Sequence, residues 1–509
     1  MLPITALVLL LPVVLWRVLR PKRLPLPPGP PKRFLTGNLH QLPKTKQWLT
    51  YADWAKTYGP IMTLQIFNRT TIILTSAKGV LDLLDSRASI YSDRPRSWML
   101  HTLAGQDASM FGLSSRDLRF PRYRKMLVAG LNKRSVTKYR PELENRLKGL
   151  LRGLAENAND FESLLTTYTG GIALKAGFRL YSIAYGYDVV EPAENDYFVQ
   201  LIDKADSAMP TLVQPFYFVE VFPFLRFLPK WFPTATFHRI ALEKKKILDA
   251  MVYVPYEWAK KKLETSPSEP SFFSQHFLDE DEKKTSQEDA DNLMWTSGAI
   301  YSGGAHTTSS ALTSFFLLIS THSEIQKAAQ AEIDRVVGRG RLINSDDKTS
   351  LPYINALIKE VLRWAPVAPM GLRHSVTQDD IYEGYLIPKG SMIISNIWAV
   401  THDAELYSEP FVFNPSRFLG DKQQRDPFDF VFGFGRRVCP GATLAEETIF
   451  LAIANCLSLF NISQARDTAG QEIDPMQGLD WRTGLVTLAL NFKFSLTPRS
   501  PDALDAIGL

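Results

Sequence analysis

The chain has 509 residues, of which 45% are hydrophobic and 22% are charged, as in a globular protein with a sizeable core. Its formal net charge of +5 is small for this length, and no basic stripe interleaved with aromatic residues predicts nucleic-acid binding. Only two cysteines occur, Cys439 and Cys456, which excludes a disulfide framework and indicates a reducing compartment.

The first twenty residues form an apolar segment that we expect to anchor the chain in a membrane. Leu2–Leu19 is almost entirely apolar, and about 18 helical residues can span a thin bilayer. Basic residues close the segment, so the positive-inside rule places the body of the protein in the cytosol. A cleaved signal peptide is the alternative, but a charged n-region and a small-residue cleavage site are missing. Residues 1–20 therefore predict a single-pass signal-anchor.

Residues 21–33 contain the run Leu-Pro-Leu-Pro-Pro-Gly-Pro-Pro. Proline lacks the backbone N–H and fixes φ, so we expect neither a helix nor a paired strand here. The run predicts a stiff hinge between the anchor and one large folded domain at residues 34–509.

Along that domain, patterns predict short elements first and long helices afterwards. Helices are expected at residues 47–58 and 77–85, and short strands at residues 61–66 and 70–74. Helical patterns then dominate to about residue 365, followed by a second group of short strands at residues 381–394. The chain is thus predicted to be mainly α with a minor β region.

The richest helical pattern runs from Glu288 to about Ile319. About 30 residues give a helix near 45 Å long, enough to cross a whole domain. Gly303 and Gly304 interrupt it at a cost of about 1 kcal/mol each relative to alanine. Close approach of another group or a local distortion is the expected reason for them.

The segment Phe432–Gly441, with the sequence Phe-Gly-Phe-Gly-Arg-Arg-Val-Cys-Pro-Gly, carries the chemistry. It fits the pattern F-x-x-G-x-R-x-C-x-G, and in this the chain resembles the cytochrome P450 family. A thiolate ligand pushes electron density onto haem iron and favours O–O cleavage, and free N–H groups at a following helix start stabilise that thiolate. The alternative for Cys439 is a buried structural thiol. For Cys456, core packing is expected.

The resemblance implies haem b with Cys439 as the axial metal ligand. The neighbouring residues expected at the cofactor are Phe432, Gly435, Arg437 and Gly441. The segment Phe120–Lys125 is similar to the family's W-R-x-x-R-K, which implies Arg124 as a propionate partner and Phe120 in place of the tryptophan. His374, with Arg373 beside it, matches the position that contacts the other propionate; an ordinary surface histidine is the alternative.

Two further motifs support the resemblance. Glu360 and Arg363 match the family's E-x-x-R, and at i and i+3 on a helix they face the same way; alone, they would be an ordinary exposed ion pair. Phe413–Phe418 resembles F-x-P-E-R-F with Ser416 in place of the acid, and its Arg417 would complete a buried cluster. Such a cluster fixes a conformation more than it adds stability.

The pattern breaks in the long helix, where the family carries an acid before two threonines. Here Gly303–Thr308 reads Gly-Gly-Ala-His-Thr-Thr, so His306 replaces the acid while Thr307, which would hold dioxygen, is kept. The nearest acid upstream, Asp291, is about 22 Å away along a helix. Three hypotheses stay open: His306 relays protons, His306 is structural and water carries the protons, or the enzyme rearranges a peroxide and needs no protons.

The resemblance covers essentially the whole chain. In its detailed sequence the chain is most similar to fungal microsomal P450 monooxygenases, including those similar to sterigmatocystin-type oxidoreductases. It implies a P450 catalytic domain at residues 34–509, on the cytosolic side of the endoplasmic reticulum membrane. The implied reaction inserts one oxygen atom from O2 into an apolar organic substrate, such as a terpenoid or polyketide secondary metabolite or an aromatic xenobiotic. Electrons would come from NADPH through a separate cytochrome P450 reductase, with cytochrome b5 as a further candidate partner, since the chain lacks a dinucleotide fingerprint.

Two other functions are compatible with a haem-thiolate fold. One is an isomerase or dehydratase that acts on hydroperoxides without a reductase, and the other is a haem-binding sensor. Largely apolar segments are expected to contact the substrate: Trp98–Leu113, Phe216–Phe232, Ile300–Thr307, Val367–Leu372 and Gly484–Leu485. The first two are rich in aromatic residues, which could equally belong to the core or to a membrane-contacting surface. Scattered basic residues are candidates for the reductase-docking face or for ordinary solvated surface: Arg122, Lys125, Lys133, Lys422 and Arg436.

Overall fold

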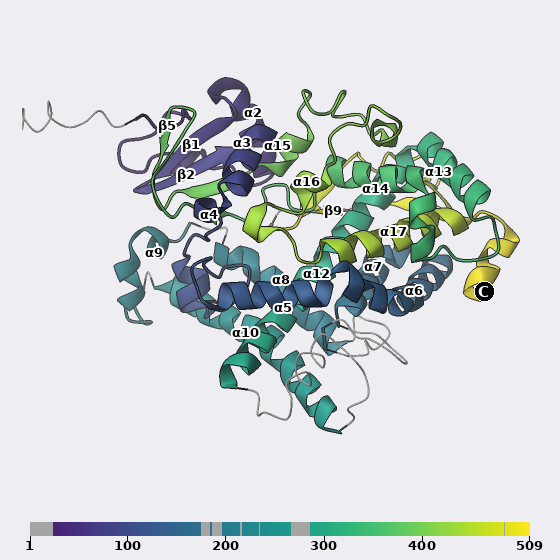
Figure 1. Ribbon diagram of the computed structural model, residues 1–509, viewed down its shortest axis with the longest axis horizontal. Helices are drawn as coiled ribbons and strands as arrows, with labels where there is room; N and C mark the ends of the chain where they lie inside the picture. Colours follow the sequence, from purple (N-terminus) through teal and green to yellow (C-terminus); the bar gives the residue numbers. More distant parts are fainter. Residues whose placement is uncertain are drawn as a thin grey trace, which may run out of the picture.

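The structure is a computed structural model, and it describes residues 24–174, 184–185, 196–213, 216–233, 235–265, 286–482 and 484–509. The membrane anchor expected at residues 1–20 lies outside these ranges. In Figure 1 a small sheet occupies one end of the molecule and the long helices fill the rest. The mainly α architecture with a minor β region is confirmed.

The helices are, in chain order, α2 Gln47–Tyr58, α3 Ala77–Val80, α4 Ala88–Tyr91, α5 Arg119–Leu131, α6 Lys133–Glu156, α7 Phe161–Leu174, α8 Tyr197–Val213, α9 Phe218–Val221, α10 Thr236–Thr265, α12 Gln287–Thr321, α13 Ser323–Val336, α14 Pro352–Trp364, α15 Ile397–Thr401, α16 Phe428–Val431 and α17 Ala442–Leu459. Short 3-10 or π-helical turns join them, among them η2 Leu81–Ser86, η3 Trp98–Leu103, η6 Pro223–Phe227, η8 Pro415–Phe418 and η9 Gly435–Arg437.

The strands are β1 Ile61–Ile66, β2 Arg69–Leu74, β3 His374–Ser375, β4 Asp380–Tyr382, β5 Tyr385–Ile387, β6 Met392–Ser395, β7 Phe460–Gln464, β8 Asp480–Arg482, β9 Leu488–Leu490 and β10 Phe494–Pro498. The largest sheet has the order β1-β2-β6-β3. Its β2 and β6 are parallel although more than 300 residues separate them in the chain, and an isolated bridge joins Asp93 to Ser375 of β3. The sheet thereby brings His374 next to residues that follow α4.

The proline-rich segment does not stand free of the body as a simple spacer would. Residues 24–29 form neither helix nor strand, as predicted, but the Pro25 carbonyl accepts a hydrogen bond from Leu386 and the Pro28 carbonyl accepts one from Thr63. These contacts are possible because proline loses its donor but keeps its acceptor. A Cβ on Gly29 would lie only 2.1 Å from the Thr63 oxygen, so the segment is pressed against β1.

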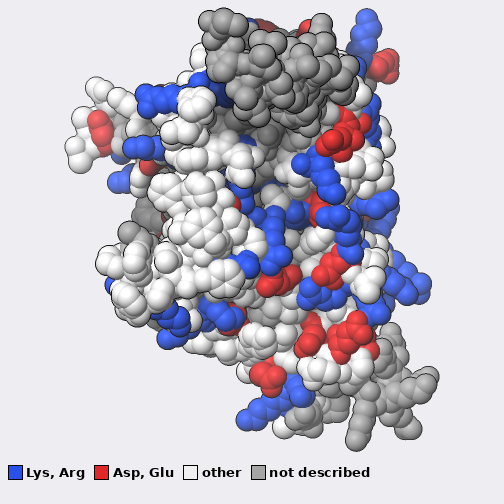
Figure 2. Space-filling view, turned by 90° about the vertical axis from the view of Figure 1, so that its left-hand side faces the viewer, with Lys and Arg blue, Asp and Glu red and all other residues white. Residues whose placement is uncertain are grey.

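Exposed aromatic side chains gather on α9, η6 and the residues that follow. Phe218, Phe224, Phe227 and Trp231 are between 57% and 79% exposed. Figure 2 views this end of the molecule, and uncharged side chains cover much of the left half of the face while charged residues gather toward the right. Such a contiguous apolar patch marks a contact surface rather than a random surface composition.

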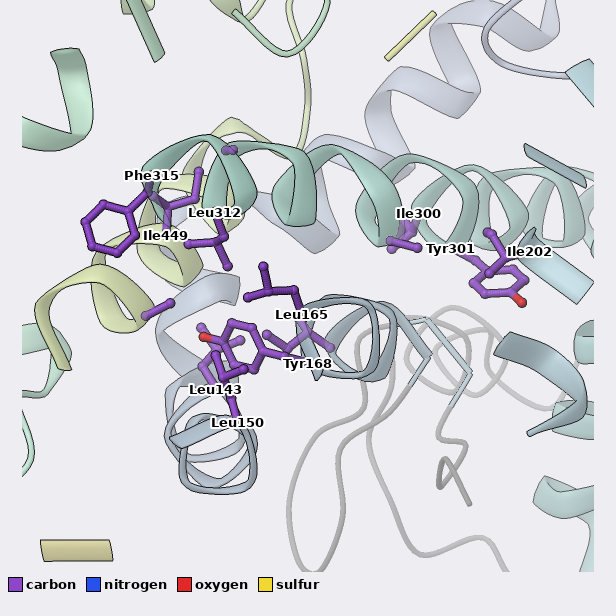
Figure 3. Packing of buried hydrophobic residues seen from close by; sticks show 14 of the residues in the cluster. Leu143, Leu150, Leu165, Tyr168, Ile202, Ile300, Tyr301, Leu312, Phe315 and Ile449 are labelled. Atoms are coloured by element: carbon purple, nitrogen blue, oxygen red, sulfur yellow. The ribbon is translucent and has the colours of Figure 1, made fainter. Parts of the chain in front are cut away.

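The core is built around α12, which begins one residue earlier and ends two residues later than predicted. The Ser286 side chain caps it by accepting from the Asp289 N–H. Figure 3 shows Leu165 and Tyr168 of α7 packing beneath it, with Leu143 and Leu150 of α6 below them. The helix is continuous through Gly303, so no local distortion occurs there. The Phe111 ring instead lies 3.5 Å from where a Cβ on Gly303 would sit.

Within the described ranges, one helix is long and apolar enough to cross a membrane, namely α17. Of its residues, 72% are buried, and it packs inside the main hydrophobic cluster. It is therefore a core helix. Cys456 lies on it and is 1% exposed, which confirms the core role predicted for that residue.

Candidate active site

Cys439 lies between the η9 turn and the start of α17. Its N–H donates to the Phe432 carbonyl at 2.8 Å, which closes the loop back on itself. A Cβ on Gly441 would lie 3.8 Å from the sulfur. The Cys439 side chain is exposed, yet it faces a space closely surrounded by protein, and this enclosure raises the pKa of its thiol. The Gly441 N–H and the Arg124 guanidinium act in the opposite direction and lower that pKa.

Gly435 holds the cysteine loop against the segment that follows β2. Its φ is +49°, and a Cβ there would lie 2.6 Å from the Leu84 carbonyl oxygen and 2.7 Å from the Ala88 Cβ. Its N–H donates to Asp85 at 3.1 Å. Glycine is required at this position because the backbones of η9 and η2 touch. Its proximity to the cofactor stays a prediction.

Arg437 points into the interior beside Phe120. Its guanidinium donates to the carbonyls of Ser92 at 2.9 Å and Leu113 at 2.5 Å, and it stacks on the Phe120 ring at 4.1 Å. Burial lowers the pKa of Arg437 to about 10. Phe120, which replaces the family's tryptophan, thus supports the arginine by a cation–π contact.

Arg124 and His374 both lie within electrostatic range of Arg437. The Arg124 guanidinium donates to the Val438 carbonyl at 2.7 Å, next to Cys439. His374 is 5% exposed, so the alternative of a surface histidine is wrong. Its Nδ1 lies 2.8 Å from the Tyr91 carbonyl. Burial, together with the charge of Arg94, lowers the pKa of His374 to about 3.

Arg373 is not brought together with these cations. Its side chain is exposed, and the ionisable groups that influence it are Tyr51 and Glu220. Successive side chains of an extended segment point to opposite sides, so the direction that places His374 inside turns Arg373 away.

Arg94 joins the cluster, and the sequence analysis missed it. Its guanidinium donates to the carbonyls of Leu372 and Arg373 at 3.0 and 2.7 Å, while its buried Nε has no partner among the described residues. Burial, reinforced by the charge of Arg437, lowers the pKa of Arg94 to about 9. In the sequence, Arg94 stands between Asp93 and Pro95, a pattern that does not predict a functional role. The role becomes apparent only in the fold, where the sheet brings residue 94 close to His374.

A second cluster fixes the segment between α15 and the cysteine loop. Glu360 accepts from the Arg363 guanidinium at 2.7 and 2.8 Å and from the Arg417 Nε at 3.1 and 3.2 Å. All three side chains are at most 2% exposed. The two guanidiniums also donate to backbone carbonyls at Thr401, Pro410, Val412 and Ser408. Ser416 takes no part, because its N–H only caps the turn through Asn414.

The two residues expected on the oxygen-binding side, Thr307 and His306, lie on α12, and their proximity to the cofactor stays a prediction. The Thr307 hydroxyl donates to the Gly303 carbonyl at 2.7 Å. His306 is 8% exposed, and its Nε2 lies 3.3 Å from a carboxylate oxygen of Asp203 on α8. Asp203 was not predicted, because it lies on α8 and sequence spacing indicates only acids on the same helix as His306.

The chemistry of these residues fits a haem group, which carries two carboxylates and needs an axial ligand. Arg124 interacts with Cys439 and with Arg437, and Arg437 interacts with Arg94. The carboxylate nearest to them, Asp93, is already bonded by Ser114, Ser115 and Arg116. Buried cations without a paired acid favour an anionic ligand. Among the described residues, no three His, Cys, Asp or Glu side chains gather to hold a metal ion. Cys439 as the axial ligand of haem iron stays a prediction.

Comparison with known proteins agrees with this geometry. The family model described as Cytochrome P450 matches residues 27–495. The cytochrome P450 monooxygenase ple1 of Rhodocybe pseudopiperita is 37% identical over 95% of this chain and 91% of its own. The cytochrome P450 monooxygenases claR of Ampulloclitocybe clavipes and ppsD of Aspergillus oryzae are each 36% identical, over 96% and 95% of this chain and 89% and 91% of their own. The chain therefore belongs to the cytochrome P450 family and is a monooxygenase related to those of fungi.

Proposed function

We propose that the protein is a membrane-anchored haem-thiolate monooxygenase that inserts one oxygen atom from O2 into an apolar organic substrate. In this proposal electrons come from NADPH through a separate cytochrome P450 reductase, with cytochrome b5 as a further candidate donor. The observation that carries it is the exposed Cys439 thiol just before a helix start, beside Arg124, which is linked electrostatically through Arg437 to Arg94.

When bound, haem supplies the oxygen-activating chemistry that the protein's own side chains lack. Cys439 would be its axial ligand. Arg94, Arg124, Arg437 and His374 would hold its carboxylates. Because the Nδ1 of His374 faces the Tyr91 carbonyl, this nitrogen carries the proton in the neutral ring. A bond donated from Nε2 to a carboxylate then requires a second proton on the imidazole.

The substrate side lies between α12, α10 and the 106–111 segment. A cavity of about 20 Å³ is found there, lined by Gln106, Ser109, Phe111, Met251, Val252, Trp295, Gly298, Ala299 and Ser302. This volume suffices for about one water molecule, so a substrate requires these elements to move apart. The mostly apolar and aromatic lining supports a terpenoid, polyketide or aromatic ligand over a charged one.

The aromatic surface supports a membrane location on the cytosolic side of the endoplasmic reticulum. Phe67 in the β1–β2 turn stacks with Phe216 at 5.7 Å and contacts Phe222. The sheet that supports this turn also receives the proline-rich segment that leads back to residues 1–20. An anchor and an aromatic patch on adjoining elements would contact the same bilayer.

The test is reconstitution of the full chain with NADPH–cytochrome P450 reductase in lipid vesicles. We expect the difference spectrum of a thiolate-ligated carbon monoxide complex, NADPH-dependent oxygen uptake, and turnover of compounds in a panel of terpenoids, polyketides and aromatics. Cys439→Ala removes all three, whereas Cys456→Ala, the matched control in the core, keeps them. Consumption of organic hydroperoxides without any NADPH-dependent oxygen uptake would contradict the proposal and favour an isomerase or dehydratase.

A further inference from the structure

Position 306, where the family carries an acid, holds a histidine here, and a carboxylate reaches that histidine from another helix. We propose that Asp203 of α8 and His306 of α12 form one proton-transfer couple that connects bulk water with the oxygen-binding side of α12. The inference rests on the proposed monooxygenase function, because only that reaction requires protons at Thr307.

The packing of α8 on α12 creates the contact. The Tyr301 hydroxyl donates to the Phe198 carbonyl, and Tyr301 also interacts with the backbone of Ile202. Figure 3 shows Ile202 and Tyr301 beside each other, close to Ile300 of α12. With residue 202 held there, Asp203 is placed 3.3 Å from the Nε2 of His306.

One residue of the couple is buried and the other is exposed to solvent. The His306 side chain is 10% exposed, whereas the Asp203 side chain is 54% exposed. His306 directly precedes Thr307 in the chain. A proton that Asp203 takes from water therefore enters the protein interior by one short transfer to His306. No charged side chain has to move into the interior.

The contact differs from a structural ion pair. The two atoms lie within bonding distance, but the bond is poorly aligned, and the buried Nε2 of His306 has no well-aligned partner among the described residues. Buried polar atoms that serve only stability are nearly always satisfied. An imidazole with a half-made bond to a wet carboxylate suits a group that exchanges protons.

The surroundings of Asp203 also suit proton exchange. Burial raises the pKa of Asp203, and the neighbouring Asp206 raises it further, while His306 and Arg482 lower it. Asp206 itself pairs with Arg482 at 3.5 Å. The net effect is a raised pKa of Asp203, which makes its protonated form more accessible.

The step is a proton transfer without change of oxidation state. Protonated Asp203 breaks its O–H bond and gives the proton to Nε2 of His306. The ring then releases the proton on its other nitrogen, Nδ1, to a water molecule, and Asp203 is reprotonated from bulk water. Exchange with water returns the ring to the tautomer that carries its proton on Nδ1, so that Nε2 can accept again. Asp203 acts through His306 and is therefore a positioning residue, not a catalytic one.

The experiment uses the full-length holoenzyme with reductase in vesicles, and ethoxycoumarin as an apolar probe. Asp203→Asn keeps the shape of the side chain and removes its proton chemistry, and Asp203→Glu restores that chemistry. Asp206→Asn, three residues along the same helix, is the matched control. The readouts are the share of NADPH electrons released as hydrogen peroxide, the solvent isotope effect on NADPH oxidation, and the melting temperature.

We expect Asp203→Asn to raise the peroxide share about threefold or more and to increase the solvent isotope effect, because a positioned acid–base group contributes a rate factor of about 10² or more. Asp203→Glu should recover the wild-type values. Asp206→Asn removes one influence on the pKa of Asp203 but keeps its carboxyl group, so it should stay closer to wild type than Asp203→Asn. The double variant with His306→Gln should be no worse than His306→Gln alone, since both residues serve one route. The melting temperatures of Asp203→Asn and Asp206→Asn should agree, because half-exposed pairs add little stability.

Three results would overturn the inference: equal peroxide shares in Asp203→Asn and Asp206→Asn, additive effects of the Asp203 and His306 variants, or a lowered melting temperature that accounts for the lost coupling. If wild type itself takes up no oxygen with NADPH and reductase, the proposed function fails, and this inference fails with it. A working wild type beside an unaffected Asp203→Asn refutes the proton-transfer couple alone.

Discussion

Replacement of Glu360 by glutamine removes the one carboxylate that two buried arginines share. Glu360 accepts from Arg363, from Arg417 and from the Asn414 N–H at 2.8 Å. Glutamine keeps the size of the side chain but offers a single oxygen, and its NH2 group faces guanidinium donors. Two cations are then left buried without a compensating charge.

The expected loss is large because no water reaches the cluster. Removing one partner of a buried ion pair costs about 3–5 kcal/mol. The P450 domain spans residues 27–495, about 470 residues, and unfolding entropy is about 2.1 cal/mol/K per residue. The unfolding entropy is thus about 1 kcal/mol/K, and Glu360→Gln should lower the melting temperature by about 3–5 °C.

The matched control is Glu324→Gln. Glu324 pairs with Lys327 at 2.7 Å with the same i, i+3 spacing on a helix, but the two side chains are 82% and 67% exposed. Exposed pairs contribute about 0–1 kcal/mol, so this variant should shift the melting temperature by less than about 1 °C. Circular dichroism of both variants in detergent measures the shifts. Equal shifts would refute the view that burial makes the Glu360 cluster important.

Three further variants test other parts of the site. Gly435→Ala should lower the free energy of unfolding by about 1–3 kcal/mol more than Gly470→Ala. Both glycines adopt positive φ, but a Cβ on Gly435 would meet the backbone oxygen of Leu84, whereas a Cβ on Gly470 would meet open space. Equal melting temperatures of the two variants would contradict this. Burial and the charge of Arg363 lower the pKa of His402 to about 3, below about 6.5 in the unfolded chain. The neutral ring therefore stabilises the fold above about pH 6.5, and this stability is lost as pH falls, by about 1.4 kcal/mol per unit. His402→Gln should thus lose less melting temperature than wild type between about pH 7.5 and 5.5, and parallel curves would exclude the effect. Arg94→Leu should speed haem transfer to apomyoglobin about tenfold, since a charge-assisted hydrogen bond is worth about 1.5–3 kcal/mol; an unchanged rate would remove Arg94 from the haem site.

The sequence predicted the local elements well, because their signals are local. The helix Gln47–Tyr58 and the strand Ile61–Ile66 have the predicted bounds, and the next strand begins at Arg69 instead of Thr70. Turn residues and alternation of apolar side chains determine such segments over a few positions. The motif around Cys439 was equally readable, since its spacing is fixed within one loop.

The missing parts are contacts that only the packed fold creates. Arg94 became part of the cation cluster because β3 and the chain after α4 meet through the Asp93–Ser375 bridge. Arg373, which follows the same sequence motif as His374, faces the other way. Sequence proximity to a motif therefore predicted position but not the direction of the side chain.

The departure at residue 306 illustrates why a broken motif need not mean a lost function. A proton route requires a titratable group within about 3 Å of the next one and an outer end in water; it does not require both groups on one helix. Asp291 on α12 lies about 22 Å along the helix from His306, while Asp203, about a hundred residues away in sequence, lies 3.3 Å from it. A change of the acid to histidine thus becomes tolerable when a crossing helix provides a carboxylate. If Asp203 has this role, loss of His306 and loss of Asp203 should impair the same step.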